Sequence, residues 1–494
     1  MRPLRPNLTK SIAPKLLINV GAGRDIPSGA SVTGRKGEKI INGGLSNTTG
    51  IIGIGNSFKS TEMHDLTLTA ASRMKVSCPV LLQSYDTEMN MLMERLSKLV
   101  EQYPNLDENT IFDTETGDWI VVDKGNYLAD EWWEIVKEYL NAKSKDTKNY
   151  VETPFTDPRT KGILKIPPPS WIQIDSASEL EATVTVNMTE DNQLGDSGGN
   201  TLFMKQGLVK HRLLMELPRM AAMSNSFFLI TAHLGTELSM GGKYDQPVKK
   251  LQHLRKGDKI KGISDKFLFL MSSLWYVTHS KPYIAADKGP EYPKKIGGVK
   301  DTDGTELHQI TTKQLRSKSG PSGYALPILV SQSSGVQRTL SDFDFIKTNK
   351  RFGLAGNVQN YQIVLRPDVN LTRTTIRTKI AEDRLLDRAI TICSELLQMS
   401  IYWPYLVEDG IWCTPEVLYS DLKDMGYDWD VLLNTRGWWT PDQYNPKCGN
   451  FLSTEDLLRM RKGLYTPYWM GDDKLPKKNM VSPDNWHERQ FDDK

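Results

Sequence analysis

The chain has 494 residues, of which 38% are hydrophobic and 25% charged, the balance of a folded globular protein. It is long enough for roughly two to four domains, and it lacks the apolar run of about 18 residues that predicts a transmembrane helix. The first six residues are basic without the apolar core of a secretory signal. We therefore expect a cytoplasmic protein with no membrane partner.

The spacing of the cysteines and the distribution of charge indicate which cysteine frameworks are excluded and where an anionic partner would bind. The cysteines form no Cys-x-x-Cys pair, which argues against a zinc ribbon or a disulfide framework and favours buried thiols: Cys78, Cys393, Cys413 and Cys448. The net charge of +2 is uneven, because residues 400–494 hold 16 acidic and 11 basic side chains, which leaves +7 on residues 1–399. An anionic partner is therefore expected on the N-terminal part.

Apolar runs alternate with helical patterns along most of the chain, which predicts an α/β domain with a mainly parallel sheet flanked by helices. Strands are expected over residues 50–55, 80–85, 171–174 and 227–231. Helices are expected over residues 64–74, 92–99, 130–142 and 202–223, with a helix or strand over 267–277. An insertion at about 105–170 includes a predicted hairpin over 111–122.

Beyond residue 370 the pattern becomes helical, and seven of the twelve tryptophans follow residue 400. Such a density is more typical of aromatic packing in a small core than of base stacking. We therefore divide the chain into a tail (1–17), an α/β core (18–350) and a mostly helical C-terminal domain (370–494).

A glycine-rich turn, here called the phosphate loop, separates the first expected strand from the helix that follows. Backbone N–H groups in such a turn bind phosphate oxygens, while a lysine reaches the β- and γ-phosphates and a hydroxyl binds Mg²⁺. The strict pattern has glycine where this loop has Phe58, so a fortuitous turn is the alternative. The predicted ATP-binding residues are Gly53, Gly55, Asn56, Ser57, Phe58, Lys59, Ser60 and Thr61.

Two acidic residues follow later strands and are expected beside the phosphate loop, because ligands bind at the carboxyl ends of parallel strands. Asp175 ends an apolar run, the position at which P-loop nucleoside triphosphatases carry the aspartate that holds Mg²⁺. Asp175 and Ser60 are therefore the predicted metal site. Glu88 is placed to activate the attacking water as a general base. Taken singly, each could be a solvated acid or a helix cap.

At this point the sequence resembles the RecA-type recombinases of the P-loop ATPase superfamily, most closely the UvsX-type recombinases of tailed bacteriophages. Those proteins have Ser-Phe-Lys-Ser in the phosphate loop, as at residues 57–60, and Tyr-Asp-Ser-Glu where this chain has Tyr-Asp-Thr-Glu at 85–88. Residues 194–197, Leu-Gly-Asp-Ser, resemble Ile-Gly-Asp-Ser of RecA. The resemblance covers roughly residues 18–345. The insertion, a short N-terminal segment and the C-terminal region depart from it.

The resemblance also implies roles for residues after the Asp175 strand. His233 matches the histidine of Ile-Asn-His in the phage proteins and is the expected γ-phosphate sensor, although Ala232 replaces the asparagine. Arg316 and Lys318 resemble the Lys-Asn-Lys of RecA that reaches a neighbouring subunit's nucleotide. Their spacing on an extended stretch also puts them on one face, and an ordinary solvated edge strand is the alternative.

Residues 243–261, here called the basic segment, follow the His233 strand and carry two acidic and seven basic side chains. Cationic, glycine-bearing loops suit a nucleic-acid backbone, and a solvated surface loop is the alternative. The expected DNA contacts are Lys243, Lys249, Lys250, Arg255, Lys256, Lys259 and Lys261. Residues 179–200 occupy the position of the first DNA-binding loop but lack cations, so DNA would be contacted there through backbone N–H groups or small side chains.

These features together predict a DNA-dependent ATPase with ATP and Mg²⁺ as cofactors. It would bind single- and double-stranded DNA and promote homologous pairing and strand exchange in recombination and repair. A homo-oligomeric filament is expected, in the host cytoplasm if the protein belongs to a phage, with a recombination mediator or a single-strand-binding protein as a further partner. The alternatives are a ring-forming motor or helicase of the DnaB or KaiC type, and a non-catalytic ATP-binding protein that coats DNA.

Overall fold

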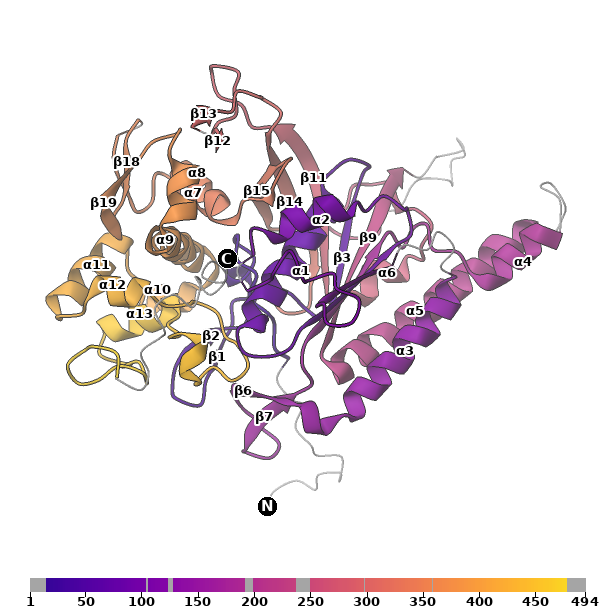
Figure 1. Cartoon of the computed structure of the whole chain (residues 1–494), viewed down its shortest axis with the longest axis horizontal. Coiled ribbons are helices and arrows are strands. Elements are labelled where there is room, and N and C mark those ends of the chain that lie inside the picture. Colours follow the sequence, from indigo (N-terminus) through magenta and orange to yellow (C-terminus); the bar gives the residue numbers. More distant parts are fainter. Residues whose placement is uncertain are drawn as a thin grey trace.

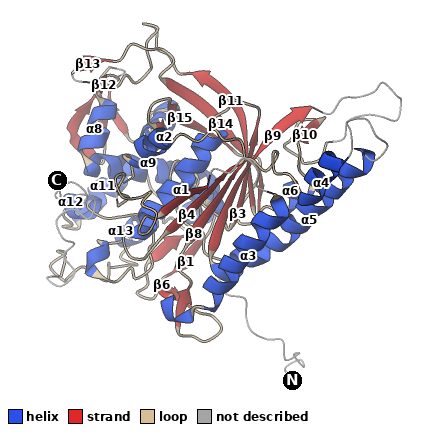
Figure 2. Cartoon of the chain, turned by 45° about the vertical axis from the view of Figure 1, so that its right-hand side comes forward, coloured by secondary structure: helices blue, strands red, loops and turns tan. Residues whose placement is uncertain are grey.

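A computed structural model describes residues 15–103, 105–122, 128–191, 199–236, 249–296, 298–357 and 359–477. Its centre is a ten-stranded, mostly parallel sheet with helices on both faces (Figure 2). This confirms the predicted α/β class. Within the described residues, helices that combine the length and apolar character needed to cross a membrane are absent.

Six strands of the sheet run parallel, in the order β11-β3-β9-β8-β4-β5. Antiparallel β14, β15 and β16 extend the sheet beyond β11, and β10 pairs with the end of β9. In chain order the bounds are β3 Thr48–Gly53, β4 Leu81–Asp86, β5 Trp119–Val122, β8 Ser170–Asp175, β9 Ser226–Thr236, β10 Asp258–Ile260, β11 Ser273–Pro282, β14 Leu307–Ser317, β15 Ala325–Ser331 and β16 Gly335–Val336.

The central strands are apolar along their whole length because both faces are covered. Successive residues enter two different cores: Ile51 packs beneath α1 (Lys59–Lys75) and α2 (Met93–Val100), on the face opposite Ile52. The second face is covered by α3 (Ala129–Lys145), α5 (Gly199–Ser224) and α6 (Lys266–Leu270). Helices α3 and α5 lie side by side and lead to α4 (Thr183–Asp191) at their far end (Figure 1).

The strands and helices expected in the core are all present, with shifted ends, but the hairpin predicted over 111–122 is wrong. Residues 111–118 form turns, where Asp113 accepts hydrogen bonds from the N–H groups of Glu115 and Thr116. β5 is instead a parallel edge strand on β4, fixed by a 2.8 Å hydrogen bond from the Trp119 indole to Ser84 Oγ. The hairpin of this region is β6–β7 (Val151–Thr156 and Ile163–Ile166).

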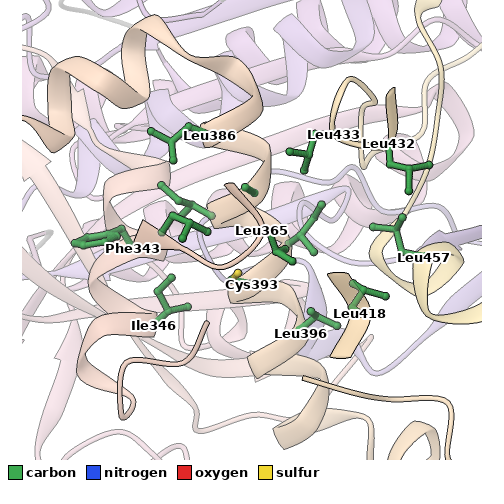
Figure 3. Packing of buried hydrophobic residues seen from close by; sticks show 14 of the residues in the cluster. Phe343, Ile346, Leu365, Leu386, Cys393, Leu396, Leu418, Leu432, Leu433 and Leu457 are labelled. Atoms are coloured by element: carbon green, nitrogen blue, oxygen red, sulfur yellow. The ribbon is translucent and has the colours of Figure 1, made fainter. Parts of the chain in front are cut away.

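Helices are the main regular structure of the described chain beyond β16, and they pack as one apolar cluster around α9 (Arg384–Tyr402) (Figure 3). It also contains the small sheet β17–β18–β19 (Leu354–Gly356, Tyr361–Ile363 and Arg366–Leu371). The helices are α7 Arg338–Thr348, α8 Ile376–Glu382, α9 Arg384–Tyr402, α10 Pro404–Glu408, α11 Pro415–Asp424, α12 Trp429–Leu433 and α13 Thr454–Arg461.

Buried tryptophans of the described C-terminal region serve packing, as predicted. The Trp403 indole donates to Ile26 O at 2.7 Å and the Trp439 indole to Leu17 O at 2.9 Å, so both join this region to the N-terminal segment. All four cysteines are buried, which confirms that expectation.

A buried group of charges connects four parts of the chain. Arg24 from the N-terminal segment pairs with Glu62 at 3.2 Å and with Asp65 at 3.0 Å, both on α1. Glu62 also accepts a hydrogen bond from Thr312 of β14, and Asp65 pairs with Arg338 of α7 at 2.8 Å. Removing one member would leave another charge buried without compensation, which typically costs about 3–5 kcal/mol. This group therefore fixes α1 against the sheet.

Candidate functional site

The strands that precede the predicted site residues end at the same edge of the sheet. Gly53, the last residue of β3, lies level with His233 of β9. Asp86, the last residue of β4, lies level with Asp175 at the end of β8. The tertiary structure therefore brings the phosphate loop, Glu88, Asp175 and His233 to one edge, as expected from their positions after strands.

The phosphate loop is a tight turn between β3 and α1, held by its own side chains. Ser57 Oγ and Lys59 Nζ both donate to the Ile54 carbonyl, at 2.8 and 2.6 Å. A Cβ atom on Gly53 would lie only 2.7 Å from Ser57 Oγ, so any other residue there would displace this hydroxyl. Among the described residues no side chain caps the start of α1, so the first N–H groups of this helix remain for a ligand. Gly55 and Asn56 are exposed, whereas Thr61 is buried in α1.

Phe58 occupies the place of a glycine and adopts a glycine-like backbone. Its φ is +65°, in the left-handed region, and Asn56 is also left-handed at +53°. The Phe58 ring packs on His308 of β14, with 5.1 Å between ring centroids. This contact gives the aromatic side chain a packing role that offsets the backbone cost. The phosphate loop therefore has the left-handed backbone turn of the strict glycine-rich pattern, although Phe58 replaces the glycine of that pattern.

The side chain of Asp175 is hydrogen-bonded both to the first turn of α1 and to β9. Its carboxylate accepts hydrogen bonds from Ser60 and from Thr231. Burial raises the pKa of Asp175 despite these bonds, and the nearby charges of Glu88 and Asp86 act in the same direction. Burial lowers the pKa of Lys59, which Asp175 and Glu88 oppose. A divalent cation would relieve the excess of negative charge at this edge.

The residues at this position fit a magnesium ion. Within the described parts of the chain, clusters of three or more His, Cys, Asp or Glu that could hold a metal ion are absent. Mg²⁺ commonly takes only one or two protein oxygens and completes its shell with phosphates and water. Asp175 and Ser60 form such a pair beside the phosphate loop.

Glu88 is held in a defined position at the end of β4. Its Oε1 atom lies 2.8 Å from His233 Nε2 and accepts a 2.8 Å hydrogen bond from Ser176 Oγ. Asp86 shapes the turn by accepting hydrogen bonds from the N–H groups of residues 88, 90 and 91. Burial alone would raise the pKa of Glu88, but the bonds to His233 and Ser176, with the His233 and Lys59 charges, lower it. The carboxylate is therefore ionised at neutral pH.

The basic segment is described from residue 249 onward. β10, near the end of the segment, pairs with residues 234–236 of β9, so this part of the segment runs beside the residues that follow His233. Lys250 is committed to an ion pair with Asp265 at 2.9 Å. The other described cations of the segment lie on the exposed surface: Lys249, Arg255, Lys256, Lys259 and Lys261. Lys243 and residues 194–197 lie outside the described residues.

Arg316 and Lys318 lie near the amino ends of the parallel strands, whereas the phosphate loop follows the carboxyl end of β3. Arg316 is level with Leu274 and Gly50. The Lys318 N–H bonds to Ser272 O, and Ser272 lies level with Thr48, the first residue of β3. The loop begins after Gly53, which lies roughly 10 Å further along the sheet than Arg316 and roughly 16 Å further than Lys318. Burial and then the charge of Arg316 lower the pKa of Lys318, as expected for two neighbouring cations. The backbones of both residues are therefore displaced from the phosphate loop toward the amino ends of the parallel strands.

Sequence reasoning missed three residues that shape the site: Ser176, which bonds Glu88; Thr231, which bonds Asp175; and Asp86, which orders the turn between them. Thr231 had a detectable signal, since it is a polar residue within an apolar strand, two positions before His233 and thus on the same face. Ser176 had none, because its contact depends on the pairing of β4 with β8.

The chain matches no protein-family model, and a search of curated proteins likewise finds no match.

The bond between Ser176 and Glu88 should stabilise the protein in a pH-dependent way. A depressed carboxyl pKa contributes stability above the ordinary pKa of the group and loses it as the pH falls through the depressed value. Ser176→Ala should therefore lower the free energy of unfolding by about 1 kcal/mol at pH 7, and urea titrations should show that difference shrinking toward pH 3. In a Glu88→Gln background the same substitution should show no such pH dependence; an identical trend there would refute the assignment.

Proposed function

We propose that the protein is a DNA-dependent ATPase of the RecA-type recombinase class, which binds ATP and Mg²⁺ at the carboxyl edge of its sheet and pairs homologous DNA. The observation that carries this proposal is the convergence of Lys59, Asp175 and the Glu88–His233 pair at one edge. The sequence resemblance supports the finer assignment to recombinases.

In this proposal each group has one task. The N–H groups of the phosphate loop and Lys59 hold the phosphates, and Ser60 with Asp175 binds Mg²⁺, which would neutralise phosphate charge. Glu88 is ionised and accepts a proton from the attacking water. His233 lies between Glu88 and the basic segment, where it can report the state of the γ-phosphate.

Arg316 and Lys318 fit a role in trans. They lie at the amino edge of the sheet, so a second copy stacked head to tail would bring its cations toward the carboxyl edge of the first. A cation supplied in this way stabilises charge on the γ-phosphate in the transition state. The proposed assembly is therefore a homo-oligomer that completes its nucleotide sites at subunit contacts.

Two substitutions separate nucleotide binding from hydrolysis. Lys59→Ala should weaken ATP binding and abolish turnover, because it removes the cation that faces the phosphates. Glu88→Gln should retain binding of a fluorescent ATP analogue and lower kcat by about 10²–10⁴-fold, because only the base is lost. Glu94→Gln, on the exposed side of nearby α2, is the control. Normal hydrolysis by Glu88→Gln would disprove the general-base role, and a wild type without turnover would favour the non-catalytic alternative.

The exposed cations of the basic segment should contact the DNA backbone. Replacing Lys249, Arg255 and Lys259 with alanine should weaken binding of single-stranded DNA and reduce the log–log salt slope by roughly 0.7 for each phosphate that the protein no longer neutralises. The control removes three exposed lysines near the far end of the sheet: Lys145, Lys148 and Lys161. If both triple variants keep the wild-type slope in fluorescence-anisotropy titrations, the DNA site lies elsewhere.

Electron microscopy distinguishes the recombinase from the motor. With ATP, Mg²⁺ and single-stranded DNA, we expect helical filaments that are absent with Arg316→Ala, because that substitution removes a cation at the proposed subunit contact. Closed rings under the same conditions would instead assign the protein to the ring-forming motors, and naked DNA would reject both.

A further inference from the structure

A buried lysine outside the residues assigned above joins the site to the basic segment. Lys210 lies on α5 and is only 3% exposed. Its ammonium group donates to three backbone carbonyls: Ala177 O at 3.1 Å, Ser178 O at 3.3 Å and Gly262 O at 2.5 Å. An ammonium has three N–H donors and is seldom buried unless they are satisfied. Burial lowers the pKa of Lys210 to about 8, although Glu179 and Glu181 oppose the shift.

The three acceptors belong to two functional segments rather than to α5. Ala177 and Ser178 lie in the turn that follows Asp175, and Gly262 directly follows the last residue of the basic segment, just after β10. The two segments touch at Gly262, whose φ is +65°. A Cβ atom there would lie 2.2 Å from Ser178 O, so any larger residue would push the segments apart.

The same two segments are also connected through His233. The His233 N–H donates to Ser178 Oγ at 3.0 Å, and the Lys261 N–H donates to His233 O at 2.9 Å. The His233 ring in turn bonds Glu88. Lys210 therefore adds a third link between the turn after Asp175 and the end of the basic segment, the same two parts of the chain that His233 joins.

We propose that Lys210 is a positioning residue that holds the basic segment against the turn after Asp175, so that a change at Glu88 and His233 moves the segment. The link to DNA rests on the proposed function, whereas the contact itself does not. A lysine that only anchored α5 would stabilise the fold equally in every ligand state. A positioning lysine must change how the segment responds to nucleotide.

The contact is tested first without any ligand. In the full-length protein, Lys210→Met removes three donors while keeping an unbranched side chain, and it should accelerate hydrogen exchange at the Lys261 amide by about tenfold or more. The control is Arg212→Met on the same helix, whose side chain is 78% exposed and pairs with Glu216 at 3.4 Å. Unchanged exchange at Lys261 in Lys210→Met would overturn the proposal.

The transmission is tested next with single-stranded DNA. We expect wild-type protein to bind it at least tenfold more tightly with a non-hydrolysable ATP analogue than with ADP, and Lys210→Met to bring this ratio close to one while ATP affinity stays within about twofold. Gly262→Ala should act on the same contact, so the double variant should resemble either single one. A wild-type ratio retained in Lys210→Met would overturn the positioning role. A ratio of one in the wild type would instead reject the proposed function, and the exchange measurement would still decide the contact.

Discussion

Parallel pairing of β3, β9, β8 and β4 is the constraint on which the candidate site depends. Each strand carries, at or near its carboxyl end, a residue that matters only in combination with the others. The backbone ladder aligns Gly53 with His233 and Asp86 with Asp175. A slip of one residue in any of these strands would turn its side chains to the opposite face. The buried side chains on both faces fix the register, so the apolar core is also what positions the polar edge.

At this end of the sheet, acidic side chains outnumber the buried lysine of the phosphate loop. This excess of negative charge suits a bound cation that accompanies an anionic ligand. Asp175, Glu88 and Asp86 crowd near one buried lysine, and burial raises the pKa of Asp175. A magnesium ion would compensate the carboxylates, and phosphate oxygens would take up Lys59 and the N–H groups at the start of α1. Glu88 differs from Asp175, since its hydrogen bonds to His233 and Ser176 keep it ionised.

Two sets of contacts attach the candidate site to the rest of the structure. One set holds α1 in place, and the other connects His233 to the basic segment. Arg24, Glu62, Asp65 and Arg338 fix α1, and with it the phosphate loop, from beneath. On the side of β9, the contacts around His233 and Lys210 continue into the basic segment. The helix that follows the phosphate loop is therefore fixed by buried charge, whereas the connection to the segment runs through backbone carbonyls at a glycine.

The sequence by itself determined the α/β class, the order of strands and helices, and the chemical types at the strand ends. Those features follow from local periodicity and from turn residues such as those of the phosphate loop. The hairpin over 111–122 was beyond local reasoning, because Trp119 forms an edge strand only where β4 offers its backbone and Ser84 its hydroxyl. The tertiary structure alone decided that Ser176 bonds Glu88, that Lys210 joins Gly262 to the Asp175 turn, and that Arg316 lies level with Gly50 rather than with the phosphate loop. Each of these depends on segments far apart in sequence, and such arrangements are set by strand register and side-chain packing, which local sequence patterns do not encode.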